Sequence, residues 1–458
     1  MQIVETILEY NEAKVAISNR NVFVFIIWDN LEYHPAISDV VCIYVYIIDL
    51  DEIFVFSISH KDAVDSFSID EINNIFIDAN IIYTPFKKDL LYIFSEILEP
   101  KIIDLAGIAH IILNEKYEID NNNILLPFYR KYESVNNVNS YIPLLKLIEY
   151  ADCVKEYNKR LVGISYNNSR NFLFHNNVVI PTLYFLEKDG LEIDSNKIKE
   201  YFGERSVKYI NNNKLYSKYN PYTITGRVSN SYGGINFSAL NKHSGEREAF
   251  ISRFDNGRLI LIDFDSFHIR LIGDLIDIHF DRESVHTQLA KQYYNTDEIS
   301  PEMYESSKQQ TFKLLYSNDR EDMGVEFFKK LIEYKQLLWE TGKINGYIES
   351  PEGRRFYLNT IEMCNQGKLF NYLLQAIEME VSMKLISKLE PLFEDIESKI
   401  ILYTYDSILI DFDYSDGRNV LKNIIEILED NSRFPIKIYI GKTYNNLTNI
   451  TEDIGKLS

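Results

Sequence analysis

The sequence predicts a multidomain protein that combines α/β and α+β architecture, and three observations lead to this fold class. The chain has 458 residues, more than one hydrophobic core usually serves. Hydrophobic residues make up 46% of it and aromatic residues 14%, which is enough to fill more than one core. Strand-like and helix-like segments alternate along the chain, as they do in mixed folds of this kind.

The first part of the chain has the pattern of strands followed by helices. Runs rich in β-branched and aromatic residues at 21–28, 40–50 and 53–60 are separated by polar turns, which is typical of strands. From about residue 88 to 162, apolar residues recur every three or four positions, which predicts helices. These segments indicate one α/β or α+β domain that ends near the polar stretch 165–171.

The second part of the chain also mixes helices and strands. Segment 178–202 predicts a helix, a turn at Gly190, and a second helix capped by Asp194. The elements expected after it are a strand within 257–276, mainly helices over 284–345, a hairpin over 399–413 that turns near Asp406, and a strand over 434–441.

The charge balance limits the classes of partner. The chain carries 48 Lys and Arg against 68 Asp and Glu, for a formal net charge of −20. This excludes a surface that is basic all over, so a nucleic-acid partner would have to be held in a local basic cleft.

Cysteine usage and hydropathy point to a soluble, cytoplasmic protein. The three cysteines lie far apart without a CxxC pair, so neither a disulfide framework nor a zinc site is expected. The N-terminus lacks the basic start and apolar run of a signal peptide, and no segment reaches about 18 consecutive apolar residues. The cysteines are Cys42, Cys153 and Cys364.

Two aspartates interrupt apolar, strand-like runs that lie far apart in the sequence. Asp263 stands in "LIDFDSFHIR" and Asp406 in "TYDSILIDF". Adjacent strands of one sheet could bring them together, and two facing carboxylates stay ionised only if a cation sits between them. Hard oxygen ligands favour Mg²⁺, and a pair of Mg²⁺ ions suits in-line phosphoryl transfer. The alternative is that each aspartate caps a turn or faces solvent.

A segment between the aspartates carries a cation and two rings at helical spacing. If "YESSKQQTFKLLYS" is a helix, Lys308, Phe312 and Tyr316 share one face. Such a face could hold a triphosphate and stack against a base and sugar. The alternative is an ordinary amphipathic helix with a solvated lysine.

In order and spacing, these segments resemble family A DNA polymerases, the group of bacterial DNA polymerase I and many phage replicases. Aligning the first palm motif on Arg270 places the metal-binding aspartate at Asp263, and the second palm aspartate falls on Asp406. Lys308, Phe312 and Tyr316 match the motif of the finger helix. The resemblance implies that the backbone carbonyl of Phe264 joins the two aspartates as a metal ligand.

Further segments extend the resemblance in collinear order over roughly residues 177 to 445. "TITGRVSN" resembles the segment that places Arg227 in the minor groove at the primer end, and "FNYLLQAIE" would put Asn371 and Gln375 near the template-primer junction. Arg270 is expected on the primer-template side as well. "VHTQLA" resembles the segment whose histidine, here His286, touches the incoming phosphates. "SPEGRRFYL" and "FPIKIYIGKTY" resemble the segment after the fingers and the closing palm strand.

The sequence departs from the family pattern at three positions. His268 replaces the glutamate that lies near the sugar and excludes ribonucleotides; an imidazole is still bulky, and the alternative is a histidine without a gating role. Ser407 replaces the glutamate after the second aspartate, as in single-subunit RNA polymerases. Tyr304 stands where an arginine would contact phosphate, which leaves His286 and Lys308 to bind the triphosphate, either alone or with Lys313 from a neighbouring turn.

The resemblance implies a 3′-5′ exonuclease-type domain of ribonuclease H-like fold before the polymerase. The family motif is Asp-x-Glu, but Asp29 and Glu32 are three apart, which on a regular strand places them on opposite faces. Asp89 and Asp152 are the candidates for the other two motifs, and no Tyr or His stands four residues before Asp152. A retained fold with lost activity is the preferred interpretation.

The whole pattern predicts a right-hand polymerase with palm, fingers and a reduced thumb. The expected domains are 1–165, exonuclease-like, and 166–458, polymerase, with thumb remnant and palm over 166–283, fingers over 284–345 and palm over 346–458. The short segment before Arg227 predicts a weak grip on duplex and low processivity.

The implied activity is primer-dependent, template-directed DNA synthesis from dNTPs with two Mg²⁺ ions, which Mn²⁺ could replace. Primer-template DNA is the expected partner, with a processivity factor, helicase or primase as accessories and no membrane. Compact size and an AT-biased composition favour a phage replicase. Two alternatives stay open: a single-subunit RNA polymerase or primase-like enzyme, and a non-catalytic DNA-binding subunit with the same fold.

Overall fold

The computed structural model describes residues 1–30, 32–61, 67–119, 122–132, 137–316 and 324–452. The chain forms two compact units, Met1–Lys188 and Asp189–Ser458. The first unit therefore extends past residue 165, where the sequence pattern places the end of the first domain.

The first unit is built on a six-stranded mixed sheet with the order β1-β4-β3-β2-β5-β6. Strand β3 is antiparallel to both of its neighbours, whereas β1 runs parallel to β4, and β5 and β6 run parallel to β2. The three strands expected between residues 21 and 60 are confirmed as β2, β3 and β4. The bounds are β1 Gln2–Val4, β2 Asn21–Trp28, β3 Val40–Ile47, β4 Glu52–Ser57, β5 Ile81–Thr84 and β6 Ile102–Asp104.

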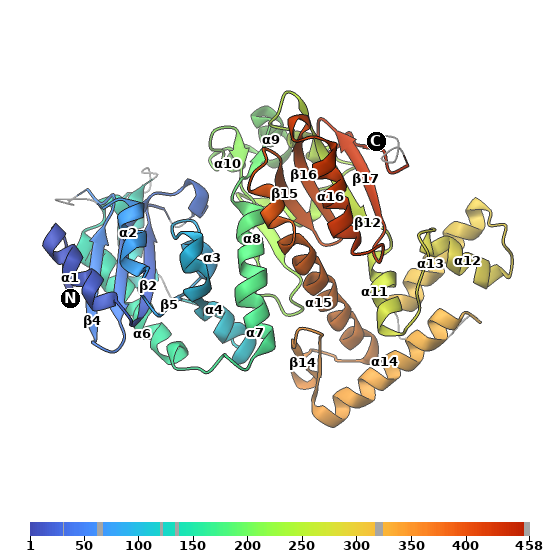
Figure 1. Cartoon of the computed structure of the whole chain (residues 1–458), viewed down its shortest axis with the longest axis horizontal. Coiled ribbons are helices and arrows are strands. Elements are labelled where there is room, and N and C mark those ends of the chain that lie inside the picture. Colours follow the sequence, from blue (N-terminus) through green and yellow to red (C-terminus); the bar gives the residue numbers. More distant parts are fainter. Residues whose placement is uncertain (31, 62–66, 120–121, 133–136, 317–323, 453–458) are drawn as a thin grey trace. The chain divides into compact units, whose positions relative to one another are not determined.

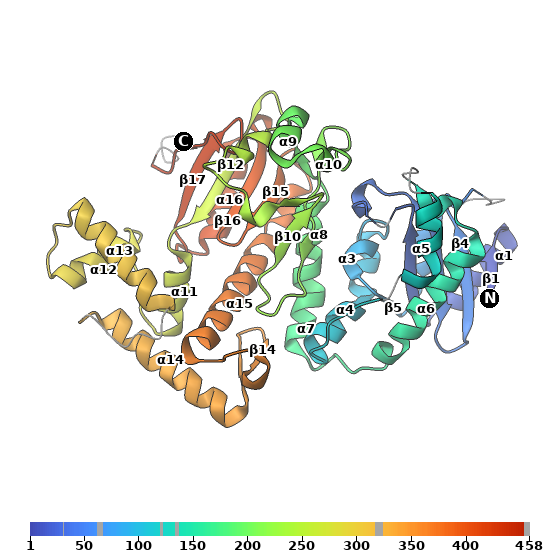
Figure 2. The same cartoon turned by 180° about the vertical axis from the view of Figure 1, so that it is seen from behind.

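Helices cover both faces of this sheet, as expected for strands that are buried along most of their length (Figures 1 and 2). The described part of 88–162 is largely helical as expected, but β6 interrupts it before the helix that Asp104 caps, and residues 114–119 lie outside helices and strands. The helices are α1 Ile7–Ile17, α2 Ile69–Phe76, α3 Lys87–Leu90, α4 Leu105–Gly107, α5 Asn122–Lys131, α6 Leu144–Val162, α7 Arg170–Phe174 and α8 Ile180–Glu187, with π-helical segments at Ile108–Ile112 and His175–Val179.

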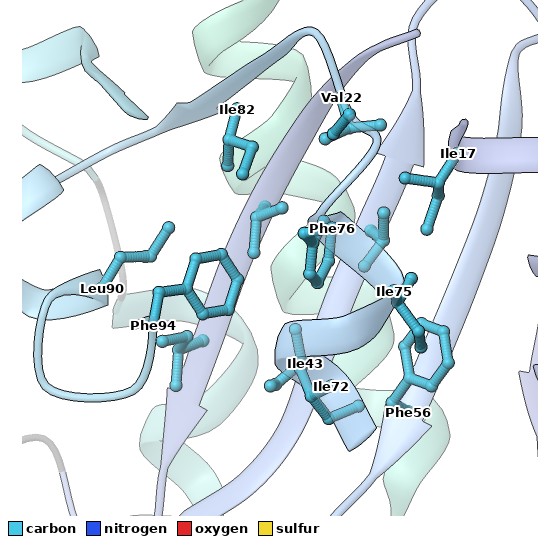
Figure 3. Packing of buried hydrophobic residues seen from close by; sticks show 14 of the residues in the cluster. Ile17, Val22, Ile43, Phe56, Ile72, Ile75, Phe76, Ile82, Leu90 and Phe94 are labelled. Carbon is cyan, nitrogen blue, oxygen red and sulfur yellow. The ribbon is translucent and has the colours of Figure 1, made fainter. Parts of the chain in front are cut away.

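The core under α2 shows how side chains from distant segments close one face of the sheet. Figure 3 shows Ile72, Ile75 and Phe76 of α2 packed toward Ile43 and Phe56 of the strands. All five side chains are almost completely buried. The capping box at Ser68 fixes the start of α2, so that its apolar face meets the strands.

Polar contacts attach α7 and α8 to the first unit. The Nε2 of His175 lies 2.9 Å from Oδ2 of Asp104, and the side-chain oxygen of Asn176 accepts from the backbone N–H of Asp104 at 3.0 Å. The ammonium of Lys88 lies 2.5 Å from Glu187. These buried pairs explain why the compact unit ends at residue 188 and not at 165.

The second unit contains a five-stranded antiparallel sheet with the order β15-β16-β12-β17-β18. The bounds are β12 Gly257–Phe264, β15 Lys399–Thr404, β16 Ser407–Asp413, β17 Ile436–Gly441 and β18 Thr448–Asn449. The expected hairpin over 399–413 and the expected strand near 434–441 are confirmed. Central strand β12 pairs along its length with both β16 and β17, so its end is the best-fixed point of the sheet.

Helices surround this sheet and extend from it. α15 is long and largely buried, and it contacts α11, α13, α14 and α16 (Figure 1). The expected helices between residues 284 and 345 are α12, α13 and α14. The bounds are α9 Ser195–Phe202, α10 Glu204–Val207, α11 Phe267–Leu275, α12 Val285–Tyr294, α13 Pro301–Tyr316, α14 Glu326–Asn345, α15 Gln366–Ser387 and α16 Arg418–Glu429.

Short strands join the remaining segments of the second unit. Gly190 adopts a positive φ of 61°, and Asp194 caps α9 through the backbone N–H groups of Asn196 and Lys197, so the expected turn and cap are confirmed. The strands are β7 Leu191–Glu192, β8 Lys214–Leu215, β9 Tyr219–Asn220, β10 Ser229–Tyr232, β11 Ile235–Asn236, β13 Tyr347–Glu349 and β14 Arg355–Tyr357. Within the described ranges, no helix has both the length and the apolar character that crossing a membrane requires.

The core under α2 gives a test of the first unit. Phe76 is fully buried, with its ring centroid 4.9 Å from that of Phe94. Phe76→Ala should lower the free energy of unfolding of this unit by about 3–5 kcal/mol, because it leaves a cavity. Urea denaturation followed by the fluorescence of Trp28, in a Trp339→Phe background, measures this. The neighbouring Ile77→Ala is the control, since Ile77 is 44% exposed and should change little.

Candidate active site

The segment "LIDFDSFHIR" forms a strand, a tight turn and a helix. Strand β12 ends at Phe264, Ser266 takes the left-handed conformation with φ 55°, and α11 begins at Phe267. Asp265 therefore lies in the turn and not on the strand of Asp263. The chain turns after Phe264, and Asp263 is left at the end of the central strand.

Strand pairing brings the two aspartates together. Asp263 lies opposite Ser407 in the register of β12 and β16, directly beside the turn that contains Asp406. The backbone N–H of Phe264 donates to the carbonyl of Asp406 at 2.9 Å. Tyr405, with φ 58°, holds the tight turn before Asp406. The sequence expectation that adjacent strands unite these carboxylates agrees with this geometry.

The electrostatics of this pair suit a cation. Desolvation, and then the charge of Asp406, raises the pKa of Asp263 to about 7. Desolvation, and then the charge of Glu378, raises the pKa of Asp406, although its side chain reaches solvent. Among the described residues no basic side chain forms an ion pair with Asp263 or Asp406, so a bound divalent ion would relieve their repulsion.

The donor set is small and consists of oxygen atoms. Across the described ranges no group of three or more His, Cys, Asp and Glu side chains is placed to hold a metal ion, so the two aspartates need a further donor. Phe264, between Asp263 and the turn, can supply its backbone carbonyl oxygen. Oxygen ligands of this kind, completed by water and phosphate, are those that Mg²⁺ prefers.

Asp265 and Arg270 stabilise the backbone beside the aspartate pair. Asp265 forms an ion pair with Lys437 and lies 4.0 Å from Arg270. Arg270 is only 4% exposed, and its guanidinium donates to the backbone carbonyls of Asp265, Phe280, Asp281 and Glu283. The expectation that Arg270 contacts primer-template DNA is contradicted, because its donors are directed inward. Arg270 instead anchors the chain between α11 and α12.

The helix expected to bind the nucleotide is α13, and its three candidate residues share one face. The rings of Phe312 and Tyr316 are stacked, with centroids 6.4 Å apart and planes 6° from parallel. Both side chains are 42% exposed. Lys308 lies one turn before Phe312, so a cation and a flat aromatic surface follow each other along α13.

His286 packs behind this face and is not charged at neutral pH. Its ring contacts Phe312 and Tyr304, with centroids 5.6 and 6.0 Å away. Burial, and then the charge of Lys308, lowers the pKa of His286 to about 4. Tyr304, which replaces an expected arginine, thus contributes packing and no charge. A neutral imidazole can still donate or accept a hydrogen bond, so the expected contact of His286 with the incoming phosphates stays a prediction.

His268 is held between two partners. Its Nδ1 lies 2.8 Å from the hydroxyl of Tyr316, and its Nε2 lies 3.0 Å from Oε1 of Glu378. The first contact joins α11 to the aromatic face of α13, and the second joins it to α15. His268, which replaces the family glutamate, therefore contacts Tyr316, one of the expected nucleotide-binding residues, directly.

Arg227 approaches the same carboxylate from the other side. Its Nε lies 2.9 Å from Oε2 of Glu378, and its guanidinium lies 3.6 Å from the ring centroid of Tyr405. Tyr405 precedes Asp406, so Arg227 stands next to the aspartate pair. Sequence reasoning missed Glu378, although it could have been found from helical spacing.

That spacing is visible on α15. Asn371, Gln375 and Glu378 lie at i, i+4 and i+7, which places them on one face of the helix. Asn371 and Gln375 are both partly exposed. The buried Oδ1 of Asn371 has no hydrogen-bond partner among the described residues, so this amide still has capacity to bind a ligand.

The candidate exonuclease residues in the first unit do not form one cluster of carboxylates. Asp152 on α6 accepts from the hydroxyl of Tyr44 and pairs with Lys155 at 2.8 Å. Asp29 follows β2, and desolvation, then the charge of Asp39, raises its pKa to about 6. Asp89 lies on α3, and Asp29 and Glu32 both lie after the end of β2, so these three carboxylates do not share a strand.

Over about half of its length the chain is similar in sequence to DNA polymerase I proteins. No family model matches the chain. The thermostable DNA polymerase I of Thermus aquaticus is 22% identical over 251 residues, which cover 47% of this chain and 30% of that protein. The thermostable DNA polymerase I of Thermus filiformis is 19% identical over 265 residues, 50% of this chain and 32% of that protein. DNA polymerase I of Deinococcus radiodurans is 20% identical over 258 residues, 47% of this chain and 26% of that protein. The chain thus spans less than a third of the length of these relatives.

A solved structure matches over nearly the whole chain. It is the POL domain of Pol1 from M. smegmatis in complex with DNA primer-template and dNTP, with a TM-score of 0.69 and 11% sequence identity, and it covers 97% of this chain and 99% of that chain. The chain therefore has a mixed α/β fold that matches a DNA polymerase I polymerase domain. Together with the relatives, this match confirms the resemblance to family A DNA polymerases.

The raised pKa of Asp263 predicts a pH-dependent stability. In the metal-free protein the folded state keeps a proton on Asp263 between about pH 4 and 7 that the unfolded chain loses, so stability should fall as pH rises through this window. Asp263→Asn should weaken this fall, leaving the variant at least about 2–4 °C more stable than wild type at pH 8. Thermal unfolding with and without Mg²⁺ measures it.

The control for this prediction is the exposed Asp277, whose replacement by Asn should leave the pH profile unchanged. Mg²⁺ at pH 8 should stabilise the wild type and not Asp263→Asn. Equal pH profiles for wild type and Asp263→Asn would contradict the assigned repulsion.

Proposed function

We propose that the protein is a template-directed, primer-dependent DNA polymerase that adds dNTPs by two-metal phosphoryl transfer during DNA replication. The observation that carries this proposal is the pairing of β12 with β16, which sets Asp263 beside Asp406. Electrostatic coupling between Tyr316 and Asp406 supports a site in which the aromatic face of α13 is close to this pair.

The metal-binding role belongs to the end of β12 and to the turn between β15 and β16. Asp263, Asp406 and the backbone carbonyl of Phe264 would hold two Mg²⁺ ions, which Mn²⁺ could replace. Bound there, the ions would supply positive charge at the attacking and leaving oxygens of an in-line displacement. The protein's own contribution is to keep the carboxylates adjacent and to stabilise their surroundings through Asp265, Lys437 and Arg270.

The nucleotide-binding role belongs to α13 and its neighbours. Lys308 would contact the triphosphate and offset charge that develops on the leaving pyrophosphate. Phe312 and Tyr316 would stack against the base and sugar, with His268 near the sugar. His286, neutral at pH 7, would offer a hydrogen bond to phosphate, so Lys308 has the larger electrostatic role.

The primer-template role belongs to Arg227, Asn371 and Gln375. Hydrogen-bond acceptors in the minor groove differ little among base pairs, so residues there can check the shape of a nascent pair without reading its sequence. The exposed part of Arg227 and the unsatisfied oxygen of Asn371 support this role. With a net charge of −20, such contacts should depend strongly on salt.

The architecture supports a division into the parts of a right-hand polymerase. In this proposal the five-stranded sheet with α11, α15 and α16 is the palm, α12–α14 are the fingers, and the reduced thumb lies before Arg227. The sheet order of the first unit, with β3 antiparallel beside central β2, supports a ribonuclease H-like domain. The ion pair of Asp152 with Lys155 supports a domain that has lost its exonuclease activity.

The proposed setting is replication of a phage genome in the host cytoplasm, with a processivity factor, helicase or primase as accessory partners. The competing functions are an RNA polymerase or primase, which would synthesise without a primer or prefer NTPs, and a non-catalytic DNA-binding subunit. The intact set of Asp263, Asp406, Lys308 and the stacked rings argues against the last of these.

Primer extension tests the proposed function. With dNTPs and Mg²⁺, the wild type should extend a templated primer, whereas Asp263→Asn, Asp406→Asn and Lys308→Ala should each lower the rate by at least about 10²-fold, since each removes charge stabilisation in the transition state. Asp277→Asn serves as the control and should extend normally. Unimpaired synthesis by both aspartate variants would refute the assigned site.

The same assay separates the competing functions. Extension of an unprimed template, or preference for NTPs over dNTPs, would favour the RNA polymerase or primase. A wild type that binds primer-template and never extends it would favour the non-catalytic subunit.

The exonuclease domain has its own test. A primer with a mismatched 3′ end, incubated with Mg²⁺ and without dNTPs, should keep its length, because Asp152 is engaged by Tyr44 and Lys155. Gel electrophoresis over a time course measures this. Metal-dependent shortening that Asp29→Ala abolishes would show that proofreading survives.

A further inference from the structure

Glu378 is a carboxylate in the buried part of α15, 1% exposed to solvent. A charge at such a site is costly unless other groups compensate it. Two side chains from separate segments approach it: Arg227 from the loop between β9 and β10, and His268 from α11. This carboxylate therefore connects three parts of the second unit at the proposed catalytic site.

The two carboxylate oxygens divide these contacts. Oε2 lies 2.9 Å from Nε of Arg227, and Oε1 lies 3.2 Å from its Nη2. Oε1 also lies 3.0 Å from Nε2 of His268, at ion-pair distance though without full hydrogen-bond alignment. A shift of Glu378 would thus be felt by both the arginine and the histidine.

The chemistry of the imidazole gives these contacts a direction. An ionised carboxylate only accepts hydrogen bonds, so the Nε2 of His268 must carry a proton to face Glu378 favourably. In the neutral imidazole Nδ1 is then the acceptor, and the hydroxyl of Tyr316, 2.8 Å away, donates to it. The position of Glu378 is thus compatible with the tautomer of His268 whose Nδ1 accepts from Tyr316.

Arg227 is fixed in a comparable way. Its guanidinium lies between Glu378 and the ring of Tyr405, with 3.6 Å to the ring centroid. A planar, charged group held by a carboxylate on one side and an aromatic face on the other has little rotational freedom left. The side chain of Arg227 keeps 29% of its surface exposed, so part of it is accessible to a ligand.

Resting on the proposed polymerase function, we propose that Glu378 is a positioning residue that sets sugar selection and the primer-end contact together. Through His268 it fixes Tyr316 at the nucleotide sugar, and through Arg227 it fixes the minor-groove contact at the primer end. A correctly seated primer terminus and a deoxynucleotide are then recognised by side chains that share one anchor.

Glu380 provides a matched control on the same helix. It is also a buried carboxylate, 2% exposed, but it accepts from the hydroxyl of Ser350 and the backbone N–H of Glu352. It contacts none of the proposed site residues in the described structure. Glu380→Gln thus reproduces the loss of a buried carboxylate on α15 without disturbing His268 or Arg227.

The experiment compares wild type, Glu378→Gln and Glu380→Gln in steady-state primer extension with dNTPs and with NTPs, and in primer-template binding by fluorescence anisotropy. Glu378→Gln should raise KM for dNTP about tenfold with kcat nearly unchanged, as expected for lost ground-state positioning. It should also lower dNTP/NTP discrimination and primer-template affinity about tenfold, the effect of one weakened charged hydrogen bond. Glu380→Gln should match the wild type in all three.

Double variants show whether Glu378 acts through its partners. In a His268→Ala background, Glu378→Gln should cause no further loss of discrimination, and in an Arg227→Ala background no further loss of primer-template affinity. If Glu378→Gln unfolds because Arg227 loses its counterion, the Arg227→Gln/Glu378→Gln pair removes both charges. A loss of sugar discrimination in this double variant would still support the link between Glu378 and His268, and retained discrimination would overturn that link.

The outcomes for the two proposals are distinct. A wild type that extends primers, with Glu378→Gln indistinguishable from it in KM, discrimination and affinity, overturns the role of Glu378 and leaves the polymerase function in place. A wild type that extends no primer with any nucleotide refutes the proposed function, and the role of Glu378 falls with it.

Discussion

The repulsion between Asp263 and Asp406 is the constraint on which the proposed site depends. Two carboxylates remain adjacent at the ends of paired strands only if the backbone holds them there. Here β12 is paired on both sides, and the N–H of Phe264 bonds to the carbonyl of Asp406. The sheet therefore stores an unfavourable interaction that a divalent cation can relieve.

The basic residues around this pair are bonded to other groups. Lys437 lies opposite Asp263 in the register of β12 and β17, yet its ammonium pairs with Asp265. Arg270 directs its donors to backbone carbonyls, and Arg227 is engaged by Glu378 and Tyr405. None of these basic residues forms an ion pair with the aspartate pair in the described structure, and the charges of Lys437 and Arg227 offset only part of the desolvation that raises the pKa of Asp263 and of Asp406.

The substitution of His268 for the family glutamate is accompanied by a carboxylate from another element. The family glutamate would contact Tyr316 directly. In this protein the imidazole of His268 contacts Tyr316, and the carboxylate of Glu378 on α15 contacts the imidazole. Such an arrangement makes the orientation of Tyr316 depend on two further residues. Through Glu378, α15, which carries Asn371 and Gln375, is also connected to the proposed nucleotide-binding residues.

The sequence by itself determined the alternation of strands and helices, the β12 and β16 pattern, and the helical face of Lys308, Phe312 and Tyr316. These features follow from local periodicity, because a helix or strand with one solvated face repeats apolar residues on its buried face. The resemblance to the first palm motif, aligned on Arg270, implied Asp263 as the metal-binding aspartate of this segment.

Only the tertiary structure decided which charges are available. Local sequence cannot tell that Arg270 is consumed by backbone carbonyls, that His286 is kept neutral by burial and Lys308, or that Glu378 joins Arg227 to His268. Each of these depends on the distance between segments far apart in the chain. Burial and pairing, which set the free energy of a charge, are properties of the folded protein and not of a motif.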